Sequence, residues 1–282
     1  MTALFEQSYS NIWLASYPKS GNTWFRLVWR ELTTDKSLEE IRPAAAPQPG
    51  DLQGTLLAGI DLRQLSGFEL LSVRAELENA AKVEAPPILR KTHERFMRTA
   101  SGAEVFPAAG TRGALVIVRD PRDVVLSYAR HYSFTIDESI DRLCRAVPIG
   151  EGFPSRLVTA GGPGAWWQHL QSWVEGPSFP VRVFRYEDFR TDPVSVFADA
   201  LDFCGLDFAR EQIAAAVQAC DLSVLREREQ ARGFTERIGA QPFFGEGRVG
   251  GWQSQLSAPQ VESLEKANGE WMVRFGYEMS AK

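Results

Sequence analysis

Cysteine and histidine are both scarce in this chain, with three of each among 282 residues. The cysteines Cys144, Cys204 and Cys220 are odd in number, and their spacing fits neither a zinc site nor a redox pair. We therefore predict three reduced cysteines in the core and no metal site built on them.

Long apolar runs and an excess of basic residues are lacking as well. No run approaches the roughly 18 apolar residues that a membrane span needs, and the start MTALFEQSYSNIW has no signal-like apolar segment. We expect a cytoplasmic protein with no membrane partner. The net charge of −5 argues against a nucleic-acid partner, because binding to that backbone needs a basic surface. A small anionic ligand is still compatible with a locally basic pocket.

The rest of the composition, 44% hydrophobic and 24% charged, is that of an ordinary globular protein. No internal repeat or low-complexity run divides the chain. We predict a single domain over residues 1–282, long enough to bury one large core.

Short runs of β-branched and aromatic residues predict four buried strands. Three of these strands lead into helical patterns, and an alternation of strands and helices predicts an α/β fold around a parallel sheet. The strands are Ile12–Ser16, Ile88–Lys91, Ala114–Arg119 and Val181–Tyr186, and the helices are Thr23–Leu32, Pro121–His131 and Pro193–Gly205.

Helix boundaries are marked by capping residues. Asp120 before Pro121, and Asp192 before Pro193, each place a capping carboxylate ahead of a proline at the first helical position. Ser257 has a glutamine three residues later, which predicts a last helix running to about Phe275 and bracing the domain.

The segment SYPKSGNTW, residues 16–24, lies between a strand and a helix, where parallel-sheet proteins bind phosphates. Its backbone N–H groups are placed to hold an anion, Gly21 permits a close approach, and Ser20 and Thr23 offer hydroxyls. Lys19 supplies a cation, but it precedes the glycine, unlike the lysine of an ATP-binding P-loop. A plain strand-to-helix turn with a surface lysine also fits these residues.

Two further segments carry reactive side chains at strand ends. In VIVRDPRDVVLSY, Arg119 and Ser127 form a cation and hydroxyl pair suited to one phosphate, although Arg119 also suits a structural ion pair with Asp120 or Asp123. In ILRKTH, His93 follows a strand and is a candidate general base, against the usual structural role of a lone histidine.

Together these segments resemble the cytosolic sulfotransferases. SYPKSGNTW is similar to that family's YPKSGTTW signature, with Asn22 in place of one threonine, and Lys91, Thr92 and His93 reproduce its KTH segment. The family also has an arginine followed eight residues later by a serine, as Arg119 and Ser127 are here. The resemblance runs from about Ile12 to Tyr277 and implies a P-loop-like parallel sheet of about five strands.

The resemblance implies transfer of a sulfuryl group from 3′-phosphoadenosine 5′-phosphosulfate (PAPS) to a hydroxyl of a small acceptor, leaving adenosine 3′,5′-bisphosphate (PAP), with no metal. His93 would be the base and Lys19 would act on the leaving 5′-phosphate. The residues implied to bind the cofactor are Lys19, Ser20, Gly21, Asn22, Thr23, Trp24, Arg119, Ser127, Tyr186, Gly247 and Arg248. Of these, Arg119 and Ser127 would bind the 3′-phosphate, and Trp24 and Tyr186 would lie near the adenine.

The sequence departs from the family pattern in one stretch. Many members carry Arg-Lys-Gly before the final tryptophan element, where this chain has Gly245, Glu246 and Gly247. Either Arg248 takes over the phosphate contact or the loop is arranged differently. The FxGEGR pattern resembles bacterial sulfotransferases of secondary metabolism, and the glycines of about 240–256 predict a lid over the cofactor.

The acceptor is not readable, because the segments of about 43–85 and 133–167, which line the acceptor pocket in this family, match no pattern. Two rival functions fit parts of the sequence. A small-molecule kinase would use the same anion loop with ATP and take Asp120 or Asp123 for magnesium, and a catalytically silent nucleotide-binding scaffold is compatible with the Gly-Glu-Gly departure. A homodimer is possible, since the family often forms one.

Overall fold

The fold was analysed in a computed structural model, which describes residues 11–33, 88–148, 162–238 and 241–280 and four isolated positions between 69 and 75. Within those ranges the chain forms a parallel sheet with the strand order β2-β1-β3-β4. The strands are β1 Asn11–Ser16, β2 Ile88–Thr92, β3 Thr111–Val118 and β4 Val181–Arg185. All four predicted strands are present, and the sheet of the described residues has four strands where about five were expected.

The central strands β1 and β3 are buried on both faces, as continuous apolar runs of a parallel sheet require. The prediction of burial is wrong for β4, which is the edge strand and exposes Arg182. Its predicted last residue, Tyr186, instead begins a helix. Because β1 lies between β2 and β3, the chain after β2 passes β1 and returns to the sheet as β3, on the opposite flank of β1. The ends of β1 and β3 therefore flank a topological switch point, where α/β proteins bind ligands.

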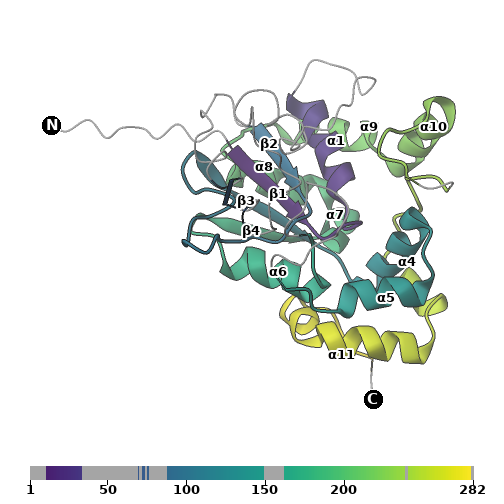
Figure 1. Ribbon diagram of the computed structural model, residues 1–282. Helices are drawn as coiled ribbons and strands as arrows, with labels where there is room; N and C mark the ends of the chain where they lie inside the picture. The colour runs from purple at the N-terminus through teal and green to yellow at the C-terminus, as the bar shows by residue number, and fades with distance from the viewer. Residues whose placement is uncertain are drawn as a thin grey trace, which may run out of the picture.

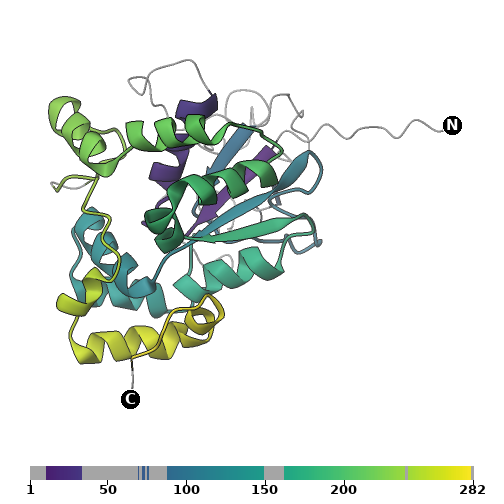
Figure 2. The same ribbon diagram turned by 180° about the vertical axis from the view of Figure 1, so that it is seen from behind.

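Helices cover both faces of the sheet (Figures 1 and 2). Helix α6 and, further out, α4, α5 and α11 lie on one side, and α1, α7, α8, α9 and α10 lie on the other. The helices are α1 Asn22–Thr33, α4 Pro121–Tyr132, α5 Ile136–Cys144, α6 Trp166–Glu175, α7 Tyr186–Thr191, α8 Pro193–Phe203, α9 Arg210–Ala219, α10 Leu222–Arg232 and α11 Ala258–Arg274, with a 3-10 turn η3 at Gly251–Ser254.

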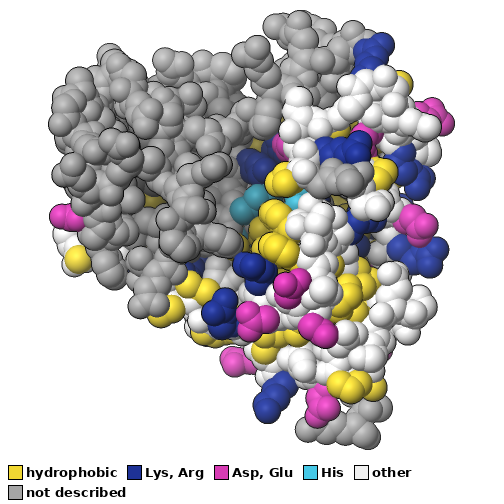
Figure 3. Space-filling view, turned by 45° about the vertical axis from the view of Figure 1, so that its right-hand side comes forward, with side chains coloured by type: hydrophobic (Ala, Val, Ile, Leu, Met, Phe, Trp, Pro, Cys, Tyr) yellow, Lys and Arg dark blue, Asp and Glu magenta, His cyan; other side chains and the backbone are white. Residues whose placement is uncertain are grey.

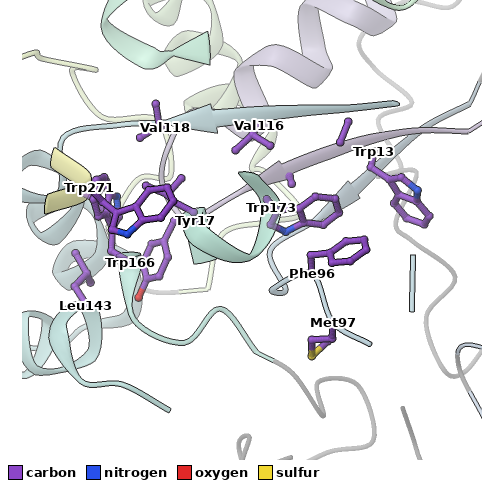
Figure 4. Close-up of a cluster of buried hydrophobic side chains, with 14 of the residues drawn as sticks. Trp13, Tyr17, Phe96, Met97, Val116, Val118, Leu143, Trp166, Trp173 and Trp271 are labelled. Carbon is purple, nitrogen blue, oxygen red and sulfur yellow. The ribbon is translucent and has the colours of Figure 1, made fainter. Parts of the chain in front are cut away.

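Alternate residues of each central strand enter opposite cores, as the two-residue period of a strand dictates. On β1, Trp13 and Ala15 face the α6 side, whereas Ile12 and Leu14 face the α1 side. The α6 side is rich in tryptophan, and Figure 4 shows Trp13 and Trp173 on one part of it and Tyr17, Trp166 and Trp271 on another.

The predicted capping residues act as expected. The Asp120 carboxylate accepts a hydrogen bond from the backbone N–H of Arg122 at 2.9 Å, and that of Asp192 accepts one from Ser195 at 3.1 Å. At the start of α11, the Gln260 side chain accepts from the backbone N–H of Ser257 at 3.0 Å. These bonds satisfy donors that a helix start leaves unpaired.

The last helix, α11, braces the molecule as predicted. It packs against α4, α5 and α6, with Trp271 and Met272 buried in the core on that side. An ion pair of 2.8 Å joins Glu265 on α11 to Arg122 at the start of α4. The position of α4, which begins shortly after β3, is thus tied to the end of the chain.

Two structural findings concern what the sequence has little of, namely cysteine and long apolar runs. The three cysteines are free, with Cys204 and Cys220 buried and Cys144 only partly so. Across the described residues, no helix combines the length and apolar character that crossing a membrane demands.

Candidate active site

A cavity of about 700 Å³ opens at the carboxyl ends of the strands. It is lined by the loop after β1, by the ends of β2 and β3, by one face of α4 and by the segment after α10. On that face of the molecule, histidine side chains lie among Lys, Arg and hydrophobic side chains (Figure 3). All the predicted site residues except Ser20 line it: Lys19, Gly21, Asn22, Thr23, Trp24, His93, Arg119, Ser127, Tyr186, Gly247 and Arg248.

The loop after β1 has a backbone that few sequences adopt. Lys19 has φ of 72° and Gly21 has φ of 101°, both in the left-handed region. Backbone of this kind is typical of anion-binding nests, and here it leads directly into the start of α1, although the Ser20 N–H also donates to the carbonyl of Tyr17 at 3.3 Å. Gly21 is required for space as well, since a Cβ there would lie 2.6 Å from the ring of Tyr186.

Ser20 lies behind the loop rather than in the cavity. Its side chain is fully buried, and its Oγ has no hydrogen-bond partner among the described residues.

Lys19 is partly buried, with its Nζ 3.9 Å from the centre of the Phe243 ring. Burial lowers the pKa of Lys19 to about 7, and the nearby Arg130 guanidinium contributes in the same direction. Near pH 7 the Lys19 amine is therefore only partly protonated, and a bound anion would favour its fully charged form.

Asn22, the departure from the family signature, turns its side chain toward β1. Its Nδ2 donates to the carbonyl of Leu14 and to Ser16 Oγ, both at 3.2 Å, while its Oδ1 accepts from Arg26 Nε at 3.0 Å. Only 3% of the residue is exposed. The amide bridges the end of β1 and the first turn of α1, which a threonine is too short to do in this way.

The neighbouring Thr23 hydroxyl is already engaged. It donates to Glu236 Oε2 at 2.8 Å, and Glu236 also pairs with Arg26. The prediction gave this hydroxyl to a ligand, so an anion at the start of α1 must share it with Glu236 or displace the carboxylate.

The tautomer of His93 is fixed by its contacts. Nδ1 lies 2.8 Å from the carbonyl oxygen of Ser16, which only accepts, so Nδ1 carries the hydrogen. Nε2 of the neutral ring is then free to accept a proton. Burial, followed by the positive charge of Lys91, holds the pKa of His93 well below its usual value. The ring is therefore neutral at pH 7, as a base must be.

Arg119 holds the neighbouring loops together through backbone carbonyls. Nη1 donates to Lys19 at 3.2 Å and Nη2 to Arg248 at 3.0 Å, while Nε is buried and unpaired among the described residues. The ion pair with Asp120 or Asp123 that the sequence left open is not formed. Asp120 pairs with Arg122, and Asp123 accepts from backbone N–H groups.

The two predicted aromatic residues differ in their surroundings. The Tyr186 ring lies under the guanidinium of Arg119, with the guanidinium carbon Cζ 4.3 Å from the ring centre, and the Tyr186 hydroxyl donates to the carbonyl of Gly247 at 3.1 Å. Trp24 is more deeply placed: its Nε1 donates to the carbonyl of Cys220 at 2.7 Å and its ring meets Phe197 edge-on.

The segment predicted as a lid is held at both ends by carboxylates. Glu229 accepts from the backbone N–H groups of Phe243 and Phe244 at 2.6 and 2.9 Å. Asp123 accepts from those of Gly250 and Trp252 at 2.7 and 3.0 Å. Between these anchors, Arg248 lies on the cavity rim with 63% of its side chain exposed, paired with Glu246 at 3.0 Å.

Several cavity residues were not predicted from the sequence: Lys91, Arg130, His131, Glu236 and Phe243. Two of them could have been predicted from their spacing. Lys91 is two residues before His93 along a strand, and Arg130 is three residues after Ser127 on a helix. Burial, followed by the charge of Lys19, lowers the pKa of His131 to about 4. Glu236 lies on a loop far along the chain, so no local sequence pattern predicts its place in the cavity.

Comparisons with known proteins agree with this geometry. The model of the sulfotransferase domain matches residues 9–276. Flavonol 3-sulfotransferase of Flaveria bidentis is 22% identical over 277 residues, covering 93% of this chain and 81% of the relative. Sulfotransferase 1A1 of Bos taurus is 26% identical over 293 residues, covering 98% and 89%.

Solved structures share the fold. A mouse sulfotransferase, SULT7A1, complexed with PAP has a TM-score of 0.59 at 16% identity, with 94% of this chain and 85% of that chain covered. Retinol dehydratase in a complex with retinol and PAP has a TM-score of 0.58 at 18% identity, covering 94% and 81%.

The fold is that of an α/β transferase with an anion-binding loop after its first strand. The chain belongs to the sulfotransferase family, since the family model spans nearly its whole length. The resemblance drawn from the three motifs is thereby confirmed, and the protein is a sulfotransferase.

Proposed function

We propose that this sulfotransferase transfers a sulfuryl group from PAPS to a hydroxyl of a small molecule, releasing PAP. One observation supports this most: Lys19, His93 and the pair of Arg119 and Ser127 meet in a single cavity. A loop for one anionic group, a site for a second and a neutral base are what a reaction between PAPS and a hydroxyl needs.

The charge around the cavity supports a ligand with two anionic groups. The described lining residues include five cationic side chains, Lys19, Lys91, Arg119, Arg130 and Arg248, and three carboxylates, Asp123, Glu236 and Glu246. Each carboxylate already has a partner: Asp123 the lid backbone, Glu236 Arg26 and Glu246 Arg248. More cationic side chains therefore line the cavity than there are carboxylates free to pair with them.

In our proposal the loop after β1 holds the 5′ end of the donor. Backbone N–H groups of residues 20–23, with Lys19, would bind the phosphosulfate. Arg119 and Ser127 would bind the 3′-phosphate. Tyr186 and Trp24 would border the adenine, and Gly247 would close over the nucleotide.

His93 would remove the proton of the acceptor hydroxyl through Nε2, which the bond from Nδ1 to Ser16 leaves free. As the acceptor oxygen bonds to sulfur, the bond from sulfur to the bridging oxygen breaks and its electron pair goes to the 5′-phosphate. Lys19 and the loop N–H groups would stabilise that developing charge. The proton stays on His93 until the product leaves.

The domain boundaries and the lid are part of the same proposal. One sulfotransferase domain would span residues 1–282, with the lid at about 240–256 closing between its two carboxylate anchors. Acceptor specificity would come from the segments of about 43–85 and 133–167. The first lies almost wholly outside the described residues, and so does the part of the second at 149–161.

A kinase using this cavity is less well supported. The acids it needs for magnesium are occupied, because Asp120 binds Arg122 in a pair of 2.7 Å and Asp123 binds the lid. No group of three potential metal-ligating side chains occurs in the described ranges.

We further propose a cytoplasmic enzyme that sulfates a small secondary metabolite and takes neither a nucleic acid nor a membrane as partner, with a homodimer as a possible assembly. A curated relative from Arabidopsis thaliana carries the name cytosolic sulfotransferase 15, at 25% identity. The FxGEGR pattern at Phe243–Arg248 motivates the metabolic assignment.

Calorimetric titration with PAP, and separately with ATP and magnesium, tests the proposal. We expect micromolar binding of PAP that is weakened at least about tenfold by Lys19→Ala and by Arg119→Ala, and much weaker binding of ATP. Tight magnesium-dependent binding of ATP without binding of PAP would favour the kinase. No binding of either would favour a scaffold.

A further inference from the structure

Arg130 belongs to the same structural unit as the proposed 3′-phosphate site. Arg119 directly follows β3, and Ser127 and Arg130 are three residues apart on α4, so the latter two lie on one face of that helix. All three side chains line the cavity. A cation therefore lies one helical turn beyond the serine that the phosphate is expected to meet.

The guanidinium of Arg130 faces the cavity without an ion pair among the described residues. Its two nearest acidic neighbours are used elsewhere, because Glu229 accepts from the backbone of Phe243 and Phe244 and Glu246 pairs with Arg248. Burial and the charge of Arg119 both lower the pKa of Arg130. The carboxylates of Glu229 and Glu246 act on this pKa in the opposite direction. Two guanidinium groups held near each other favour a polyanionic ligand.

The lid is shaped to fit over Arg130. A Cβ at position 245 would overlap the guanidinium nitrogens of Arg130, so the glycine lets the lid backbone approach that group closely. Gly245 is part of the departure in which Gly245, Glu246 and Gly247 stand where the family pattern has Arg-Lys-Gly. Space for an arginine from α4 is present where the lid's own cations are missing.

Arg248 is less suited to the same task. Its side chain is 63% exposed on the rim and is neutralised by Glu246 at 3.0 Å. Its backbone carbonyl accepts from Arg119 Nη2, whereas its guanidinium is engaged by Glu246.

We propose that Arg130, rather than Arg248, completes the 3′-phosphate site with Arg119 and Ser127. This rests on the proposed use of PAPS. The cation that many relatives supply from the lid would here come from α4, and the lid would supply backbone alone.

Calorimetric titration of the full chain with PAP and with AMP, which lacks the 3′-phosphate, tests this assignment. We expect Arg130→Gln to lower the affinity for PAP at least about tenfold and to change the affinity for AMP by less than about threefold. Arg130→Lys should recover part of the loss. The matched control Arg248→Gln should leave the ratio of the two affinities within about twofold of the wild-type value.

Two outcomes would overturn the assignment. A wild-type preference for PAP that Arg130→Gln leaves intact would exclude Arg130 from the site, and a preference lost in Arg248→Gln would assign the contact to Arg248. A wild-type protein that binds PAP no better than AMP would instead contradict the proposed function itself, and the assignment with it. Thermal unfolding of each variant shows whether the fold is retained.

Discussion

The protonation states of individual residues in the cavity are set by their surroundings. Lys19 and His93 both have lowered pKa values, and burial is the main cause for each. For the histidine this secures the neutral base. For the lysine it creates a group whose charge is completed by the ligand that it binds.

Binding of PAP is therefore expected to take up a proton. Lys19 has a pKa of about 7 in the free protein, and a bound anion raises that value because it favours the charged amine. Between pH 7 and 8.5, binding should draw a proton from the buffer and weaken as the pH rises. Calorimetry in two buffers of different ionisation enthalpy measures this uptake. Equal uptake by Lys19→Met would contradict the assignment to Lys19.

His93→Ala is expected to separate binding from chemistry. The side chain accepts the acceptor's proton but has no part in holding the phosphates, so kcat for any phenol that the enzyme turns over should fall by about 10²- to 10⁴-fold. The dissociation constant of PAP should change less than about threefold. The matched control His131→Gln alters the other histidine of the cavity and should retain kcat within about tenfold. A PAP affinity that collapses with the rate would show that His93 acts on the donor.

Asn22→Ala is expected to lower the free energy of unfolding by about 1–3 kcal/mol. The substitution leaves the carbonyl of Leu14, Ser16 Oγ and Arg26 without their buried partner. Urea unfolding measures the change. A loss smaller than that of Thr23→Ala, whose hydroxyl is only half-buried, would show that the bridge between β1 and α1 is not structural.

At the scale of elements, each side chain that we propose to be catalytic lies just after the carboxyl end of a strand, where the chain leaves the sheet. The sequence predicts these strand ends well, since proline, aspartate and glycine mark them locally. It also predicts the loop, the arginine and serine pair, and the histidine. The contacts of Glu236 with Thr23 and Arg26 span more than 200 residues, so no local pattern contains them.

Two further features also depend on contacts between distant segments, and for one of them, the burial of β4, the prediction is wrong. The apolar residues of β4 predict burial, but an edge position depends on which strands lie beside it. The motif around Asn22 predicts a ligand contact, and that contact stays a prediction, but no local pattern shows that its side-chain amide donates to the end of β1. Where the fold brings distant segments together, residue type alone does not determine the role.

The lid is expected to depend on its Asp123 anchor. Asp123→Ala removes the acceptor for the N–H groups of Gly250 and Trp252, so the lid should open more often. The dissociation rate of PAP, followed by stopped flow, should rise about tenfold. Glu246→Gln, in the exposed middle of the lid, is the control and should raise it less than about threefold. An unchanged rate in Asp123→Ala would contradict a gating role for the lid.

At the scale of the whole molecule, charge is divided between surface and cavity. The chain carries a net charge of −5, yet its cavity concentrates cationic side chains at the ends of the strands. Such a distribution attracts a small anion locally even though the net charge of the chain is negative.

Affinity for PAP is consequently expected to fall with salt, although the protein is acidic. Raising the ionic strength from about 0.05 to 0.5 M should weaken PAP severalfold, and AMP less, because AMP carries fewer charges into the cavity. Titration at three salt concentrations measures both slopes. A PAP affinity that is independent of salt would indicate recognition through the nucleoside rather than the phosphates.

The central claim, that one cavity binds both ends of a PAPS-type donor next to a neutral histidine, is tested most directly by a crystal structure of the PAP complex. We predict the 5′-phosphate at the start of α1 beside Lys19, and the 3′-phosphate between Arg119, Ser127 and Arg130. A nucleotide bound outside this cavity, or with its 3′-phosphate away from Arg119, would contradict the account.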